Sequence, residues 1–554
     1  MKIVAAQLNF KIGDFDGNAR KMVEHIEKAK KGGADLIVFS ELSVTGYYPF
    51  DLLARKEFIR MTENSVAKIA KSCIGIAAVV GAPRSVETKN GNELYNCAFF
   101  LAGGKIVSFQ DKTVLSDHGA FDESRHFKSN QKFQVVEYRG ERFGITIGDD
   151  FQEYGSDAGR LNKNSSYGKS PTREFIKLNP DFLINISAIP FAWNQEDERK
   201  DKLCATDRKI KIPVLQVNQV GANAELIFGG NSLFINQNGE IAHELNRFEE
   251  DFRMVDTKNS GVVQLQEKTE TIEKIHDALV LGIRDFFQKS GLSKALIGLS
   301  GGIDSAVTLA LAERALGAGN VWAVLLPSEI SPEHSVADAR ELAENLKIRY
   351  DILPIQKMVD SFNEKLFPLF RDTQSGVAEE NIQARVRGTL LMALSNKFGH
   401  ILLNTSNKSE SAVGYGTLYG DMTGSLAVLA DVYKTDVYNL ARFINRKGEI
   451  IPENTVLKPP SAELRPSQLD TDSLPDYAVL DKILFHYIEQ NLSPCEIVSK
   501  GFAPELTKRV IRLVNSGEFK RFQAAPVLRV SSIAFGNGRR MPLVAKFPDD
   551  CHKS

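Results

Sequence analysis

The chain has few cysteines and no long apolar run. Its 554 residues include five cysteines, at positions 73, 97, 204, 495 and 551, and these lack zinc-site spacing and are too sparse for a disulfide framework. No segment approaches the about 18 consecutive apolar residues of a membrane helix. The N-terminal segment lacks the apolar core and cleavage site of a signal peptide. We therefore expect a cytoplasmic protein without a membrane partner.

The chain also lacks an excess of charge of either sign. Lysine and arginine number 69 against 70 aspartates and glutamates, which leaves a formal charge of −1. A protein whose main partner is nucleic acid normally carries a basic excess or stripe, so this balance argues against such a partner. Apolar residues make up 43% of the sequence and no low-complexity tract occurs, as is typical of folded globular domains.

The pattern of apolar residues predicts an α/β protein of two domains, 1–266 and 267–554. In the first half, short β-branched runs alternate with helical stretches and then give way to a series rich in strands and turns. From about residue 269 a long amphipathic helix leads into a strand at 294–300, and helices and strands then alternate to about residue 350. This second pattern is typical of βαβ units and a parallel sheet.

The sequence LIGLSGGIDSAVTLA, residues 296–310, places a buried strand, a Ser-Gly-Gly turn and an apolar helix in succession. Gly301 and Gly302 allow the backbone to approach an anion, which the start of the following helix favours. Ser300 and Ser305 add hydroxyl donors, and Asp304 can hold Mg²⁺ against phosphates. The spacing is not that of the Walker motif. The segment resembles the pyrophosphate loop of the ATP pyrophosphatase superfamily, also called adenine-nucleotide alpha-hydrolase-like, which implies a parallel sheet with helices on both faces.

Further segments resemble the NAD synthetase family in order, across nearly all of residues 270–546. They include EENIQARVRGTLLMALSN, NTSNKSE, GYGTLYGDMTG, DVYKTDVYNLA and LKPPSAELRPSQLDTDSLPDY. The resemblance implies ATP-dependent amidation of deamido-NAD to NAD through an acyl-adenylate, with release of AMP and pyrophosphate. Another ATP-pyrophosphatase amidotransferase is the alternative within the superfamily.

The resemblance also implies roles for individual residues. The expected ATP contacts are Gly298, Leu299, Ser300, Gly301, Gly302, Ile303, Asp304, Ser305, Thr405 and Lys434; the expected deamido-NAD contacts are Asn381, Arg385, Glu410, Asp421 and Lys520; and the expected Mg²⁺ ligands are Asp304 and Glu410. Two alternatives stay open from the residues alone. Arg385 and Arg387 could be solvated surface charges, and Glu410 in NKSE could act only as a helix cap.

The first half resembles the carbon–nitrogen hydrolase (nitrilase) family, through VFSELSVTGYYPFDLL and FQDKTVLSDHGAFDESRHF. This implies an α-β-β-α sandwich. In glutamine-dependent NAD synthetases such a domain releases ammonia from glutamine, which needs a glutamate base, a lysine that stabilises the oxyanion and a cysteine nucleophile. By this resemblance Glu41 and Lys112 are the glutamate and the lysine.

The expected nucleophile is absent, because Gly148 follows the apolar run where the family has cysteine. Three glutamine-contacting positions also differ: His118, Ile189 and Gln195 stand where the family has tyrosine, serine and a basic residue. We therefore expect ammonia rather than glutamine as the nitrogen donor, with a separate enzyme as one source. The alternative is glutamine use with an unrecognised nucleophile. The resemblance also implies a homo-oligomer.

Overall fold

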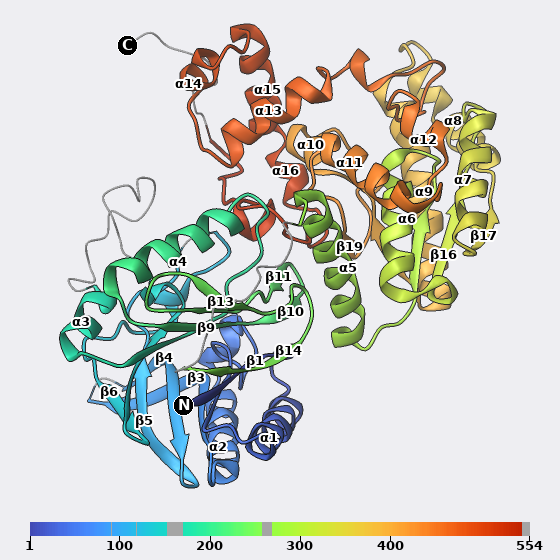
Figure 1. Ribbon diagram of the computed structural model, residues 1–554. Helices are drawn as coiled ribbons and strands as arrows, with labels where there is room; N and C mark the ends of the chain where they lie inside the picture. Colours follow the sequence, from blue (N-terminus) through green and yellow to red (C-terminus); the bar gives the residue numbers. More distant parts are fainter. Residues whose placement is uncertain (90, 118, 152–169, 258–268, 546–554) are drawn as a thin grey trace. The chain divides into compact units, whose positions relative to one another are not determined.

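The computed structural model describes residues 1–89, 91–117, 119–151, 170–257 and 269–545. The chain divides into two compact units, Met1–Lys268 and Thr269–Ser554 (Figure 1). Each unit has its own sheets and its own buried apolar clusters. The N-terminal unit is coloured blue to green in Figure 1 and the C-terminal unit green to red.

Two six-stranded sheets form the centre of the N-terminal unit. Their strand orders are β14-β1-β2-β3-β4-β5 and β13-β12-β9-β8-β7-β6, and β10 and β11 make a separate hairpin. The strands are β1 (Lys2–Gln7), β2 (Leu36–Val38), β3 (Ala77–Thr88), β4 (Gly91–Ala102), β5 (Lys105–Asp111), β6 (Val135–Tyr138), β7 (Glu141–Ile147), β8 (Phe182–Ser187), β9 (Val214–Asn218), β10 (Val220–Asn223), β11 (Leu226–Gly229), β12 (Leu233–Ile235), β13 (Ile241–Glu244) and β14 (Asp251–Asp256).

The predicted α-β-β-α sandwich is confirmed by how the faces of these sheets pack. Successive strand residues face opposite sides, so on β4 Phe100 packs between the two sheets while Phe99 and Leu101 pack with the helices. The helices α1 (Phe15–Lys31) and α2 (Lys56–Ser72) cover the first sheet. The helices α3 (Pro171–Leu178) and α4 (Glu196–Ile210) cover the second.

A five-stranded parallel sheet, with helices on both faces as predicted, forms the centre of the C-terminal unit. Its order is β17-β16-β15-β18-β19, with all neighbours parallel. The strands are β15 (Ala295–Gly298), β16 (Val321–Leu325), β17 (Arg349–Ile352), β18 (Ile401–Asn404) and β19 (Leu426–Ala427). The chain runs outward from β15 to β17 and then returns to β18 on the other side of β15. Ligands of such sheets bind at this switch point, beyond the carboxyl ends of the strands.

The helices of the C-terminal unit divide between the two sheet faces. On one face, α6 (Ile303–Leu316) packs with α5 (Thr271–Ser290), α11 (Lys434–Ile444) and α12 (Glu453–Leu457), and α12 also meets α7 (Glu333–Asn345). On the other, α8 (Gln356–Phe370) and α9 (Val377–Phe398) pack on Leu296, Val324 and Leu402. A second apolar cluster joins α10 (Lys408–Val413), α13 (Tyr477–Ile488), α14 (Pro494–Ser499) and α15 (Pro504–Ser516), and α16 (Glu518–Arg521) follows α15.

Two expectations from composition can be compared with the described residues. Among them, no helix is long and apolar enough to cross a membrane. Cys73, Cys97 and Cys204 form no disulfide bond, whereas Cys495 is disulfide-bonded, and Cys551 lies outside the described residues.

Candidate active sites

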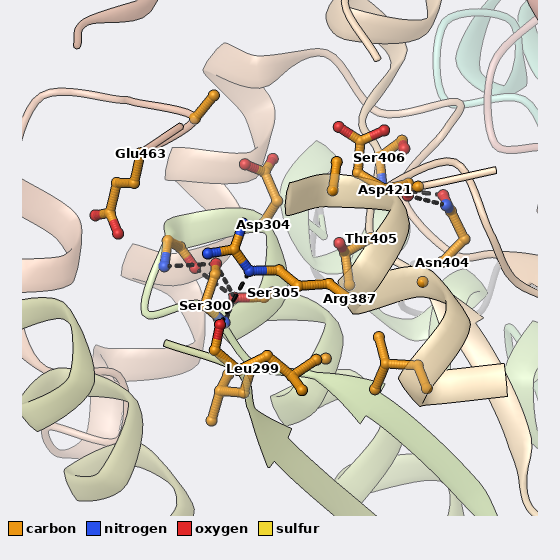
Figure 2. A pocket seen from close by; sticks show the side chains of 18 of the residues that line it. Leu299, Ser300, Asp304, Ser305, Arg387, Asn404, Thr405, Ser406, Asp421 and Glu463 are labelled. Atoms are coloured by element: carbon orange, nitrogen blue, oxygen red, sulfur yellow. Dashed lines mark hydrogen bonds between the residues drawn. The ribbon is translucent and has the colours of Figure 1, made fainter. Parts of the chain in front are cut away.

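A cavity of about 270 Å³ opens at the switch point of the parallel sheet (Figure 2). It lies beyond the carboxyl ends of β15, β16 and β18, and its lining combines an apolar part with a polar part. The apolar lining includes Leu299, Val324, Leu326, Leu391 and Leu402, and the polar lining includes Ser300, Asp304, Ser305, Arg387, Thr405, Glu410, Asp421, Lys434, Glu463 and Asp470.

The Ser-Gly-Gly turn forms one wall of this cavity and leads into α6. Gly301 has a φ of +84°, and a Cβ added there would lie 2.2 Å from the carbonyl oxygen of Ser335, so no other residue fits. The hydroxyls of Ser300 and Ser305 lie 3.1 Å apart, and Ser300 Oγ accepts from the N–H of Gly302 at 3.1 Å. The turn is therefore ordered by its own side chains before any anion arrives.

A triad of charged side chains lies beside the turn. Lys434 Nζ donates to Asp304 Oδ2 at 2.5 Å and to Glu410 Oε1 at 3.2 Å, and Asn407 Nδ2 donates to Asp304 Oδ1 at 2.9 Å. Burial raises the pKa of Glu410 to about 8, although Lys434 acts against this rise. Asn407 caps α10 and Glu410 completes a capping box, so Glu410 has both the cap role and a place in the cavity.

The cavity contains many, but not all, of the residues predicted from the sequence. Gly298, Leu299, Ser300, Gly302, Asp304, Ser305, Thr405, Glu410, Asp421 and Lys434 line it. Gly301, in the turn itself, and Ile303, the first residue of α6, are buried and are not part of the lining. Asn381 and Arg385 are not in the lining: Asn381 Oδ1 accepts from Thr417 Oγ1 at 2.6 Å, and Arg385 Nε donates to Leu418 O at 3.2 Å. Lys520 lines a small adjoining cavity, where its Nζ donates to the carbonyls of Gly414 and Gly416 at 2.7 Å.

Arg387 lines the cavity, although the sequence assigned it no specific contact and left a solvated surface charge open as an alternative. It lies on the face of α9 that also presents Ala384, Gly388 and Leu391 to the cavity, and it is largely withdrawn from solvent, which lowers the pKa of its guanidinium. The i, i+3, i+4, i+7 spacing of these four residues could be identified in the sequence. The sequence did not indicate which face of the helix packs against the sheet. Glu463 and Asp470 also line the cavity, but no motif in the neighbouring sequence identified them as site residues.

A second group of charged residues lies buried in the N-terminal unit. Lys112 Nζ lies 2.8 Å from Glu41 Oε1 and 2.8 Å from Glu123 Oε2, and all three side chains are buried. Asn96 Nδ2 donates to Glu41 Oε1 at 2.7 Å and to Glu123 Oε1 at 3.3 Å. Glu41 follows β2, Lys112 follows β5, Asn96 lies within β4, and Glu123 begins a short 3-10 turn. Sequence reasoning found Glu41 and Lys112 but missed Asn96 and Glu123.

This cluster holds two carboxyl groups for one ammonium. Burial raises the pKa of Glu41 to about 7, the nearby Glu123 adds to the rise, and Lys112 opposes it. A carboxyl group with this pKa can exchange a proton near neutral pH, as a general base requires. Glu41 and Lys112 therefore keep the arrangement of a base beside a cation.

Gly148 faces this pair directly after β7. Its φ is +52°, and a Cβ added there would lie 3.0 Å from Lys112 Nζ and 3.1 Å from Glu41 Oε2. Asn185 Nδ2 donates to the carbonyl of Gly148 at 3.1 Å. A side chain at position 148 would thus touch both the base and the cation, which is where a nucleophile activated by them would stand.

Two of the other positions that the resemblance connects with glutamine, Ile189 and Gln195, lie among the described residues. Ile189 donates its backbone N–H to Asn218 Oδ1 at 2.9 Å, and Gln195 is exposed just before α4. His118 lies outside the described residues.

Comparison with known proteins shows extensive similarity in both halves of the chain. Residues 275–524 match the NAD synthase family model and residues 2–151 the carbon–nitrogen hydrolase model. A glutamine-dependent NAD(+) synthetase from Synechocystis sp. is 41% identical, over 98% of this chain and 99% of that protein. One from Acinetobacter baylyi is 40% identical, over 99% of each. The structure of glutamine-dependent NAD+ synthetase from Acinetobacter baumannii in complex with ADP is 38% identical, with a TM-score of 0.77 over 98% of each chain.

Proposed function

Because this chain belongs to the NAD synthetase family, in the form with an N-terminal carbon–nitrogen hydrolase domain, we propose that it converts deamido-NAD to NAD with ammonia and not glutamine as the nitrogen donor. ATP-dependent NAD synthesis is the activity of the family. Our proposal about the nitrogen source depends on residues of this chain that differ from the family pattern.

The cavity of the C-terminal unit supports the activation step. The carboxylate of deamido-NAD attacks the α-phosphorus of ATP, pyrophosphate leaves, and the acyl-adenylate then accepts ammonia at its carbonyl carbon while AMP leaves. Bringing two polyanions together costs Coulomb energy in a closed site. The start of α6 and the ammonium of Lys434 supply the opposing dipole and charge.

Asp304 and Glu410 fit the role of Mg²⁺ ligands. Their carboxylates both reach Lys434 Nζ, at 2.5 and 3.2 Å, and carboxylate oxygens are the donors that Mg²⁺ prefers. Among the described residues no group of three metal-binding side chains occurs, and Mg²⁺ commonly takes one or two carboxylates and completes its shell with water and substrate phosphates. When bound it would neutralise phosphate charge.

The position of Gly148 is the observation that carries the proposal about nitrogen. A Cβ there would touch both Lys112 and Glu41, so a cysteine at this position would be the thiol that these two groups activate. Glycine offers no atom that could form a thioester. The framework of an amide-cleaving site thus remains without the atom that attacks.

Among the described residues, the three cysteines outside disulfide bonds offer no replacement for this nucleophile. Cys97 alternates with Asn96 along β4, so it faces the helix layer, whereas the Asn96 side chain reaches Glu41. Burial raises the pKa of Cys97, and raises that of Cys73 to about 12, so neither is a thiolate at neutral pH. Cys204 packs with the apolar cluster beneath α3 and α4.

The test is NAD formation by the purified protein with either ammonium or glutamine as the only nitrogen source. We expect synthesis with ammonium, and neither NAD nor glutamate from glutamine. The relatives are named glutamine-dependent, so the contrary result is that glutamine supports NAD formation. Glutamine-supported NAD formation with an equal amount of glutamate would mean an unrecognised nucleophile. If ammonium also fails to give NAD, the substrate assignment is wrong.

We further propose that the chain forms a homo-oligomer and takes its ammonia from the surrounding pool or from a separate enzyme.

A further inference from the structure

Arg387 is a partly buried cation that forms no ion pair with a carboxylate among the described residues. Its Nε donates to Leu326 O at 3.0 Å and one terminal nitrogen lies 3.4 Å from Ser328 Oγ. Within the part of the chain that the structure describes, these are its hydrogen bonds, and Glu463 and Asp421 act on it only at longer range. An arginine that is partly withdrawn from water usually has an anionic partner, because removing a charge from water is costly.

The guanidinium is held in place by a backbone carbonyl and a serine hydroxyl and not by a counter-charge. Leu326 and Ser328 follow β16, so the guanidinium is fixed to the strand next to the Ser-Gly-Gly turn. An arginine fork has five N–H donors, and the two bonds leave the remaining ones for a ligand. Figure 2 shows the side chain directed toward the part of the cavity where Ser300 and Ser305 lie.

From this geometry we infer that Arg387 binds the phosphate chain of ATP, a role that rests on the proposed function of the cavity. The guanidinium fork matches phosphate oxygens in two-point contact and the anion would supply the missing counter-charge. Both substrates carry phosphates. We assign the contact to ATP because the Ser300–Gly302 turn shares the cavity with Arg387, whereas Arg385, two residues earlier on α9, lies outside it.

The test compares binding of ATP and adenosine to the full-length protein, without turnover, in the wild type and in R387M and R387K. We expect R387M to weaken ATP binding roughly 10- to 100-fold, the usual effect of losing a charge-assisted hydrogen bond, and to leave adenosine binding within about twofold. R387K keeps the charge without the fork, so its ATP affinity should fall between the two. K397M, an exposed residue of the same helix, is the matched control and should bind ATP normally.

Steady-state kinetics separates the two phosphate sources. R387M should raise the KM for ATP and leave the KM for deamido-NAD close to that of the wild type. A rise in the KM for deamido-NAD alone, or equal losses of ATP and adenosine binding, would overturn the assignment. If thermal melting shows that R387M is unfolded, the same binding and kinetic measurements are compared between R387K and the wild type. The binding arm needs no NAD formation, so a failure of the proposed function and a failure of this inference would be distinguishable.

Discussion

At the residue scale, the proposed reaction in the C-terminal cavity requires that the phosphate charge of its substrates be neutralised. Lys434 is shared by Asp304 and Glu410, so one cation serves two acids that we assign to Mg²⁺. Removing either acid leaves phosphate charge uncompensated in a site of low dielectric, where such interactions are strongest.

We predict that D304N lowers the turnover of NAD synthesis by about 100-fold or more at saturating Mg²⁺ and ATP. The amide keeps the size of the side chain but removes the charge that would bind the metal. The measurement is kcat together with a thermal melt, and D372N, at an exposed site, is the control. Near-normal turnover of D304N would remove this residue from the site.

We predict that G148C does not restore glutamine use by itself. The new side chain would meet Lys112 and Glu41, but Ile189 and Gln195 still replace groups that the resemblance connects with glutamine. The measurement is glutamate released from glutamine by G148C and by the wild type. Release coupled to NAD formation in G148C would show that the rest of the glutamine site is intact.

At the element scale, buried polar groups hold the C-terminal helices together. Lys408, the first residue of α10, is fully buried. Its Nζ lies 2.8 Å from Asp431 Oδ1, 2.5 Å from Glu489 Oε1, 2.8 Å from Ser531 Oγ and 2.7 Å from Ile533 O, within hydrogen-bond distance of each. These contacts connect α10 with the end of α13 and with the segment that follows α16.

We predict that K408M lowers the free energy of unfolding by about 3–5 kcal/mol, because two buried carboxylates lose their cation. Urea unfolding of the full-length protein measures this change. K447M, at an exposed position, should change the same free energy by less than about 0.5 kcal/mol. Equal effects of the two substitutions would mean that the network contributes little.

The elements also show how far sequence reasoning reaches. The Ser-Gly-Gly turn was predictable because strand, turn and helix are contiguous in the sequence, and because the turn between them requires glycine. Arg387 and Glu463 were not, because their roles depend on which faces of α9 and of the 458–470 segment meet the sheet. In the N-terminal unit, Glu41 and Lys112 followed from resemblance. Glu123 and Asn96 join them only through the pairing of β4 and β5 and the turn after Ser116.

At the scale of the whole molecule, each unit carries one tryptophan, Trp193 and Trp322, so a W322F background lets fluorescence report on the N-terminal unit. Burial raises the pKa of Glu41 to about 7 in the folded unit, from an ordinary value of 4.5. Folding therefore binds a proton between these values, and the contribution of Glu41 to stability falls as pH rises from about 4.5 to 7 and is constant above.

We predict that the urea midpoint of the N-terminal unit decreases between pH 5.5 and pH 7.5, and that E41Q makes this decrease smaller because glutamine does not titrate. The measurement is Trp193 fluorescence in W322F with and without E41Q. An identical pH slope in both proteins would show that Glu41 has no such shift.

The central claim is that a complete NAD synthetase unit is joined to an amide-cleaving framework that lacks its nucleophile. The most direct measurement supplies purified protein with deamido-NAD, ATP, Mg²⁺, ¹⁵N-ammonium and unlabelled glutamine together, and determines the isotope in the carboxamide of NAD by mass spectrometry. We predict that the NAD carries only ¹⁵N and that no glutamate accumulates. Unlabelled NAD accompanied by a matching amount of glutamate would contradict the account.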